Sequence, residues 1–335
     1  MSSDTSGKTD TSERAKIELQ TGTDLTRRGL LAEAIPHLLS AMDEGAERYA
    51  SGVNLGICYL GLERHKEAIS TLTDLRSRGY KTATVDNLLT QAYIGDGQTE
   101  AALRAFQEAS SLTPRDEKLY DFVADACTDH HNYALGLRVT EIGLTQLPDS
   151  ARLHYERGLF LARMDRLNDA RPEFEEAVRL APGSYIGYLA QVQEDLYDDK
   201  LPPAIQLLRE AIRSGNRDYR TLSLLGTVLL QAGAAPGEPD FAEAQAALEE
   251  SARDRPDYSA TQIALGKLYI MEGKLEDARD HLEIARRLEP SNPAVYTNLA
   301  HVYRRLGDRE KAQMMEAELS RLLSQKKTVS GPTMP

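Results

Sequence analysis

The stretch LGKLYIMEGKLEDARDHLEIARRLEP, residues 265–290, decides the fold because two other stretches of the chain repeat its pattern. These are LTQAYIGDGQTEAALRAFQEASSLTP at 89–114 and RGLFLARMDRLNDARPEFEEAVRLAP at 157–182. Each ends on a proline, and Pro148 lies midway between the last residues of these two, 34 residues from each. A fixed period of this length indicates a repeat architecture in which one small unit stacks on the next.

Steps of 34 residues from Ala15 place nine repeats over residues 15–326, with a six-residue insertion inside the seventh repeat. The predicted repeats start near residues 15, 49, 83, 117, 151, 185, 219, 259 and 293. Short polar segments remain at the two ends, 1–14 and 327–335, and we expect them to form flexible tails.

Each repeat has the pattern of two amphipathic helices. In the eighth repeat the first helix carries Leu265 and Gly266, and the second carries Leu282 between two alanines. The small residue lets the second helix approach closely, while its large neighbours fill the remaining space. A turn residue in the left-handed conformation is expected between the two helices. Glycine occupies this turn at positions 29, 97, 233, 273 and 307.

Proline ends the second helix in five repeats, and a capping residue follows two positions later in four of them. Side-chain oxygens of Ser, Asp and Asn accept hydrogen bonds from the free backbone N–H groups at a helix start. We therefore predict that Asp116, Ser150, Ser184 and Asn292 cap the helices that follow them.

The recurrence of this pattern at a fixed register resembles the tetratricopeptide repeat family, and the resemblance covers almost the whole chain. The tryptophan usual in that family is absent, and Tyr120 and Tyr296 occupy the equivalent place. The resemblance implies an all-α, right-handed superhelical solenoid of antiparallel helix pairs, whose first helices line a concave groove. It also implies that positions 2, 5, 6, 9, 12 and 13 of each first helix face this groove.

Applied to this chain, those positions give polar stripes that differ between repeats. The third repeat offers Asn87 and Gln91, and the fifth offers Tyr155. The fourth repeat offers an acidic stripe, and the last two repeats offer basic residues. The acidic stripe is Asp121, Asp125 and Asp129, and the basic residues are Lys267, His301, Arg304 and Arg305.

The acidic stripe has two interpretations. Like charges four residues apart on a helix destabilise it by roughly 0.2–0.5 kcal/mol per pair. The stripe is either a solvated acidic face, relieved by Lys118 or by Arg152 of the next repeat, or a subsite for a basic or amide-rich segment. In the second case Asn87, Gln91 and Tyr155 extend the subsite, and the basic C-terminal end fits an anionic end of the same partner.

The formal net charge of −12 disfavours binding to a nucleic-acid backbone. The composition is that of a folded chain, and no apolar run is long enough to span a bilayer. Cys58 and Cys127 lie two repeats apart on buried faces of predicted helices, so we expect no disulfide between them. No secretory signal is visible, which makes the cytoplasm the simplest compartment unless an export signal precedes the sequence.

No catalytic or cofactor motif occurs, and nine repeats leave no room for a catalytic domain, so we predict a non-enzymatic protein without a cofactor. The predicted function is a scaffold that binds a protein or peptide segment in the concave groove. One alternative is an obligate assembly subunit that uses its convex or edge surfaces. Another is a regulatory receptor for a small molecule or metal, for which the acidic cluster at 194–199 is the best candidate. A metal fragment at His130 and His131 lacks further ligands near it in sequence.

Overall fold

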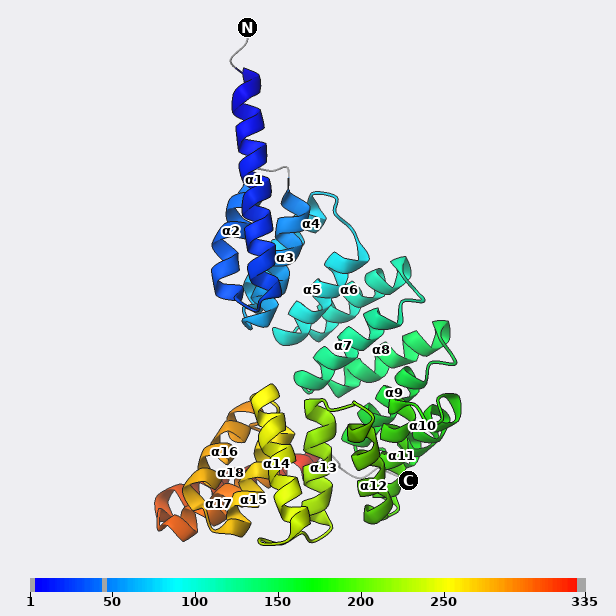
Figure 1. The fold of residues 1–335 in the computed structure, drawn as a ribbon, viewed down its shortest axis with the longest axis vertical. Helices are drawn as coiled ribbons and strands as arrows, with labels where there is room; N and C mark the ends of the chain where they lie inside the picture. The colour runs from blue at the N-terminus through cyan, green and yellow to red at the C-terminus, as the bar shows by residue number, and fades with distance from the viewer. Residues whose placement is uncertain (1–3, 44–46, 330–335) are drawn as a thin grey trace. The chain divides into compact units, whose positions relative to one another are not determined.

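The structure is a computed structural model that describes residues 4–43 and 47–329, and these residues form helices joined by turns (Figure 1). The described residues contain eighteen helices: α1 (Asp4–Arg27), α2 (Leu31–Asp43), α3 (Arg48–Gly61), α4 (His65–Ser77), α5 (Ala83–Gly95), α6 (Thr99–Leu112), α7 (Glu117–Asp129), α8 (Tyr133–Gln146), α9 (Ala151–Arg163), α10 (Leu167–Leu180), α11 (Tyr185–Tyr197), α12 (Leu201–Arg213), α13 (Tyr219–Gln231), α14 (Pro239–Asp254), α15 (Ser259–Glu272), α16 (Leu275–Leu288), α17 (Pro293–Leu306) and α18 (Arg309–Val329).

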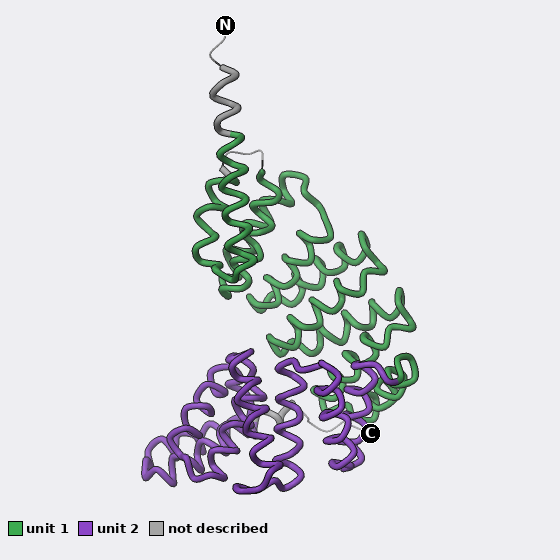
Figure 2. The backbone as a smooth tube through the Cα atoms, in the orientation of Figure 1, with its two compact units in different colours: residues 1–182 green, residues 183–335 purple. Residues whose placement is uncertain are grey.

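The helices form two compact units, which Figure 2 colours separately. Unit 1 is Met1–Pro182 with α1 to α10, and unit 2 is Gly183–Pro335 with α11 to α18. Within unit 1 each helix packs against the next, and the first helices α1, α3, α5, α7 and α9 also contact one another in succession. Within unit 2 the first helices α13, α15 and α17 do the same. The predicted all-α solenoid of helix pairs is therefore confirmed.

The helix starts follow the period of the sequence. From the third pair onward the first helices begin at residues 83, 117, 151, 185, 219, 259 and 293. At the chain ends the helices are longer than expected, because α1 begins at Asp4 and α18 continues to Val329. Both helices therefore extend into the segments 1–14 and 327–335 that the sequence predicts as tails.

In several helix pairs the second helix approaches closely to a glycine of the first helix. A Cβ atom added at Gly266 would lie 2.5 Å from Leu282 Cγ, and one added at Gly158 would lie 2.7 Å from the Phe174 ring. Leu282 and Phe174 are fully buried. The glycine hydrogen therefore leaves the space that the bulky side chain fills, as the sequence pattern predicts.

The turn inside each pair places one residue in the left-handed region. The φ angles there lie between 54° and 96°, and the residues, one per repeat at the same register, are Gly29, Glu63, Gly97, His131, Asp165, Asp199, Gly233, Gly273 and Gly307. The prediction for the five glycines is confirmed. Four repeats place a residue with a Cβ atom in the same conformation, at a steric cost of roughly 1–2 kcal/mol each. The packing of the two helices therefore determines the turn, whichever residue occupies it.

Three of the four predicted caps form. Ser150 Oγ accepts a hydrogen bond from the Leu153 N–H group at 3.1 Å, and Ser184 and Asn292 accept equivalent bonds from their own helices. The prediction for Asp116 is wrong, because its side chain makes no capping hydrogen bond. The Leu119 N–H group instead donates to the Asp116 backbone carbonyl at 3.0 Å, so a backbone oxygen takes this donor.

Neighbouring repeats are joined by a hydrogen bond at the fourth position of the first helix. Tyr120 Oη donates to the Pro114 carbonyl at 2.8 Å, and Tyr296 Oη donates to the Pro290 carbonyl at 2.7 Å. His154 and Gln262 make the same bond to the carbonyl of the proline six residues earlier. Position four therefore connects each of these repeats to the one before it.

Cys58 and Cys127 are buried and form no disulfide, as expected.

Among the described residues, no helix is both long enough and apolar enough to cross a membrane.

Replacing Glu63 with Gly should raise the stability of the protein by roughly 0.5–1 kcal/mol, because glycine adopts the left-handed conformation without steric cost. Urea unfolding followed by circular dichroism measures this change. Glu63→Ala is the matched control, since it removes the same carboxylate but keeps the Cβ atom, and it should give no gain. An unchanged or lower midpoint for Glu63→Gly would contradict the steric argument.

Replacing Gly266 with Ala should destabilise the protein by about 1–3 kcal/mol through overpacking against Leu282. Alanine is otherwise favoured over glycine in a helix interior by about 1 kcal/mol. The sign of the change in thermal midpoint therefore distinguishes the two effects, and a rise would show that the close approach does not constrain this helix pair.

Candidate functional site

Four charged side chains meet where α7 packs against α9 in unit 1. Arg152 Nε lies 3.0 Å from Glu156 Oε1 and 3.7 Å from Asp121 Oδ1. Arg152 Nη2 lies 3.8 Å from Asp125 Oδ1. The side chains of Asp121 and Asp125 are 29% and 38% exposed, whereas Glu156 is buried. We call these four residues the acidic cluster, because one guanidinium is shared among three carboxylates.

Burial raises the pKa of Asp121 to about 6, and the positive charge of Arg152 only partly opposes this shift. The nearby carboxylates Glu117, Asp125 and Asp116 raise the pKa further. The Asp121 Oδ1 atom is buried and makes no hydrogen bond within the described residues. The surroundings of Asp121 therefore favour its protonated form, or the binding of a further cation beside it.

The structure brings only part of the predicted subsite together. Asp121 and Asp125 lie in the acidic cluster, and Arg152 lies between them, as one of the two interpretations expects. Asp129 is exposed at the last residue of α7. Asn87 and Gln91 lie half-buried on α5, which packs against α7, and Gln91 Nε2 donates to Asn87 Oδ1 at 3.2 Å.

Tyr155 differs from the exposed residue that the sequence suggests. Its side chain is 7% exposed, and its ring meets the Phe174 ring edge to face at 5.9 Å between centroids. The Tyr155 side chain therefore packs mainly within the helix pair of its own repeat. Glu156, the next residue, contributes the third carboxylate of the acidic cluster instead.

The predicted basic residues lie in unit 2, on two first helices that pack against each other. Lys267 is exposed on α15, and His301 is exposed on α17. Arg304 Nε lies 3.6 Å from Glu316 Oε1 of α18, and Arg305 Nη1 donates to the Ile270 carbonyl at 3.4 Å. The two arginines are therefore tethered to neighbouring helices, whereas Lys267 and His301 extend from the surface.

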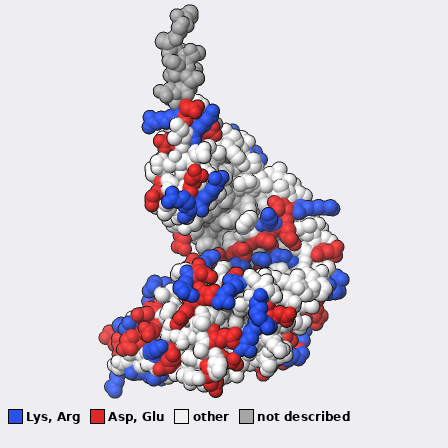
Figure 3. Space-filling view, in the orientation of Figure 1, with Lys and Arg blue, Asp and Glu red and all other residues white. Residues whose placement is uncertain are grey.

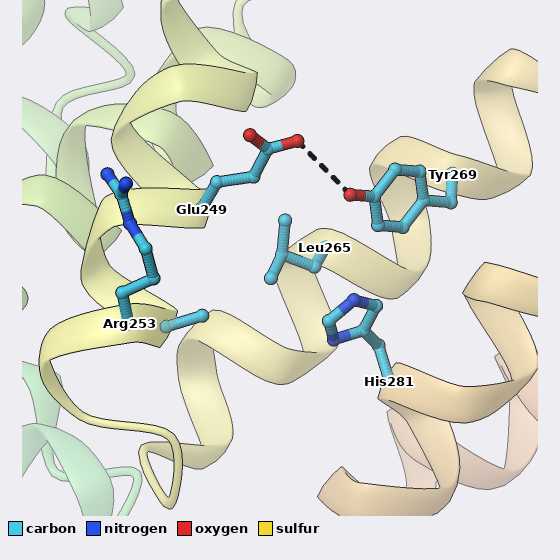
Figure 4. Close-up of a pocket in the computed structure, with 6 residues that line it drawn as sticks. Glu249, Arg253, Leu265, Tyr269 and His281 are labelled. Carbon is cyan, nitrogen blue, oxygen red and sulfur yellow. Dashed lines mark hydrogen bonds between the residues drawn. The ribbon is translucent and has the colours of Figure 1, made fainter.

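Unit 2 also contains a shallow pocket of about 310 Å³ between α14, α15 and α16 (Figure 4). Glu249 and Tyr269 point toward one another in it, and Tyr269 Oη donates to Glu249 Oε1 at 3.2 Å. His281 stacks on Tyr269 at 5.3 Å, and burial lowers the pKa of His281. The next repeat makes the same bond from Tyr303 Oη to Glu283 Oε1 at 2.7 Å. The polar groups of the pocket therefore belong to a packing motif between repeats.

The metal candidates named from the sequence lie in different surroundings. His130 meets His65 of α4 at 5.4 Å between ring centroids, a neighbour that is 65 residues away in the chain. At 194–199, Asp195 is buried, and Lys200 Nζ lies 2.8 Å from Asp198 Oδ2. Among the described residues, no group of three or more His, Cys, Asp or Glu side chains has a geometry that could hold a metal ion.

Acidic and basic side chains are interspersed over the visible face of each unit (Figure 3). The acidic cluster therefore stands out by its burial and its shared guanidinium rather than by a large field of one sign.

Replacing Asp121 with Asn should change the pH dependence of stability. A carboxyl whose pKa is near 6 in the folded state and near 3.8 in the unfolded state stabilises the fold at low pH. That stabilisation is lost as the pH rises toward and through 6. The free energy of unfolding of Asp121→Asn relative to wild type should therefore rise by about 1 kcal/mol between pH 5 and pH 7.5. Urea unfolding at both pH values tests this, and a pH-independent difference would contradict it.

Comparison with known proteins supports the repeat pattern. Sequence profiles described as tetratricopeptide repeat match residues 128–185, 237–287 and 263–313. Anaphase-promoting complex subunit 7 of Homo sapiens is 23% identical over 300 residues, which cover 74% of this chain and 52% of that protein. The chain thus spans about half the length of this relative.

Two further proteins are similar to this chain, one in sequence and one in structure. The chloroplastic tetratricopeptide repeat domain-containing protein PYG7 of Arabidopsis thaliana is 28% identical over 118 residues, or 35% of this chain and 38% of that protein. The crystal structure of the APC/C hetero-tetramer Cut9–Hcn1 aligns with a TM-score of 0.57 at 14% identity, covering 92% of this chain and 66% of that chain. Its helix pairs, its 34-residue register and the profile matches together identify the chain as a tetratricopeptide repeat protein.

Proposed function

We propose that this protein is a noncatalytic scaffold that binds a segment of a partner protein along its first helices. The nine predicted repeats, residues 15–326, form the scaffold, and the first helices line its concave surface. The acidic cluster between α7 and α9 is the observation that supports this proposal. It holds carboxylates together at a cost to the fold, and the packed helices on either side keep them in place.

The chemistry of the cluster favours a cationic or amide-rich segment. Arg152 is its one guanidinium, and three carboxylates share it at 3.0 to 3.8 Å. An incoming Lys or Arg side chain would supply a second cation, and its N–H groups would donate to carboxylate oxygens. Exposed Lys118 lies at the start of α7 and exposed Arg163 at the end of α9, so the proposed binding region is limited to Asp121 and Asp125 between these helix ends.

Neighbouring residues extend the proposed surface. Asn87 and Gln91 on α5 supply amide groups that both donate and accept hydrogen bonds. Asp129 continues the acidic stripe to the end of α7. In unit 2, Lys267 and His301, with Arg304 and Arg305, would bind an anionic part of the same partner or of another one. The net charge of −12 makes a protein a better partner than a nucleic acid.

A second candidate function is that of a subunit in a larger protein assembly. The similarity to anaphase-promoting complex subunit 7, over 74% of this chain, favours it. In that case convex or edge surfaces would be buried against other subunits, and binding would not depend on the acidic cluster.

Removing the acidic stripe should abolish partner binding through the first helices. The test is affinity capture from a native lysate with wild type and with Asp121→Asn/Asp125→Asn/Asp129→Asn. Because hydrogen bonds to charged groups contribute roughly 1.5–3 kcal/mol each, we expect at least about a ten-fold loss of specific partners by quantitative mass spectrometry.

The matched control removes three exposed carboxylates from second helices of unit 1, in Glu100→Gln/Glu141→Gln/Glu175→Gln, and should retain all partners. Partners that both variants retain would place binding outside the acidic stripe. If these partners also elute with the wild-type chain as one complex of fixed stoichiometry, the assembly-subunit candidate replaces the first proposal.

A further inference from the structure

Phe122 is the one phenylalanine of the chain that the fold leaves at the surface. Its side chain is 55% exposed, whereas the other four phenylalanines, Phe106, Phe160, Phe174 and Phe241, are at most 3% exposed. Leaving a phenyl ring in water forfeits the stabilisation that burial gives. The packing of α7 does not require a large apolar side chain here, because the neighbouring Leu119, Val123 and Ala124 already supply its buried face.

The exposed ring lies on the face of α7 that carries the acidic stripe. Phe122 directly follows Asp121 and precedes Asp125 by three residues, the spacing that places side chains on one face of a helix. From the helical rise, Asp125 is about 4.5 Å and Asp129 about 10.5 Å further along the axis. Helix α7 packs between α5 and α9, so this face is bordered by the first helices of both neighbouring repeats.

The first helices α5, α7 and α9 carry partly exposed side chains of both apolar and acidic character. Leu88 occupies the equivalent position on α5 and is half-buried, and Leu159 is half-buried on α9. The acidic cluster, Asp121, Asp125 and Glu156 with Arg152, lies on two of these helices, α7 and α9. A partner side chain over the ring would be apolar, while the side chains next to it would face carboxylates. Aromatic side chains, phenylalanine included, are enriched in the buried core of protein–protein interfaces.

We propose that Phe122 is an apolar anchor point for a partner segment in which a large aliphatic or aromatic residue is flanked by Lys or Arg. The acidic cluster binds the cationic residues, and Phe122 selects the apolar residue between them. An extended chain advances about 3.3 Å per residue, so three or four residues span the distance from Phe122 to Asp129. This inference rests on the proposed function and adds the chemical class of the segment.

The experiment selects phage-displayed random dodecapeptides on three full-length proteins: wild type, Phe122→Ser and Leu112→Ser. Leu112 is the matched control, because it is 53% exposed in unit 1 but lies at the end of the second helix α6. We expect the wild-type and Leu112→Ser pools to be enriched in Lys or Arg beside a large apolar residue. The Phe122→Ser pool should retain the basic residues and lose the apolar one.

A synthetic peptide from the wild-type pool then gives the size of the effect by fluorescence anisotropy. Phe122→Ser should weaken its binding about ten-fold, and replacing the apolar residue of the peptide with Ser should weaken binding to wild type by a similar factor. The two changes together should cost little more than either alone, which a general loss of folding would not produce.

Different outcomes separate the two proposals. Enrichment of the same apolar residue on Phe122→Ser, with basic residues retained, would overturn the role of Phe122 and leave the scaffold function standing. Pools without basic residues on any of the three proteins would overturn both. Sedimentation of wild type as a dimer that Phe122→Ser dissociates would overturn the anchor proposal, because a second copy of the chain would then cover the ring.

Discussion

The close approach of the two helices in each pair is the constraint on which the rest of the structure depends. Sixteen residues separate the glycine from the bulky side chain that covers it, as in Gly56 and Leu72, Gly158 and Phe174, and Gly266 and Leu282. This contact fixes how far the chain must run before it turns back. The left-handed turn residue follows from it, and Glu63 and Asp165 adopt that conformation although they lack the freedom of glycine. Each pair buries only part of its apolar surface, so the next pair must pack against it.

The register between repeats depends on a second interaction that tolerates different chemistry. At the fourth position of the first helix, where the tetratricopeptide pattern usually has tryptophan, Tyr120, His154, Gln262 and Tyr296 all donate to the carbonyl of a preceding proline. His154 also bonds Glu173 at 2.8 Å, and this hydrogen bond raises the pKa of the imidazole. In these four repeats the side chain at position four differs, but each one donates a hydrogen bond to the previous repeat. A sequence comparison that expects tryptophan alone would undervalue these repeats.

The sequence predicts the fold well because one period determines both the packing contacts and the turns. It predicts the surface less well, because the exposed fraction of a side chain changes gradually around a first helix and also differs between repeats at the same position. Position five is 29% exposed at Asp121 but only 7% exposed at Tyr155, since the Tyr155 ring reaches Phe174. Arg152 is a foreseeable counter-ion, yet its sharing among Asp121, Asp125 and Glu156 requires the contact between α7 and α9. Phe122 stands at position six of its first helix, one of the positions expected to face the groove, and the 34-residue pattern indicates its exposure without singling out the residue.

The acidic cluster destabilises the fold and the helix-pair contacts stabilise it, and this balance allows the proposed binding surface to persist. Burial next to Glu117, Asp125 and Asp116 raises the pKa of Asp121 to about 6, which means that its charged form destabilises the folded chain near neutral pH. The burial of Phe174 against Gly158 and of Phe106 against Tyr120 is independent of pH and offsets this cost. The repeat core therefore tolerates Asp121 at a site that destabilises its charged form. If the proposed function holds, a partner that supplies cations to this surface would stabilise the fold as it binds, which would couple affinity and stability at α7 through the same side chains.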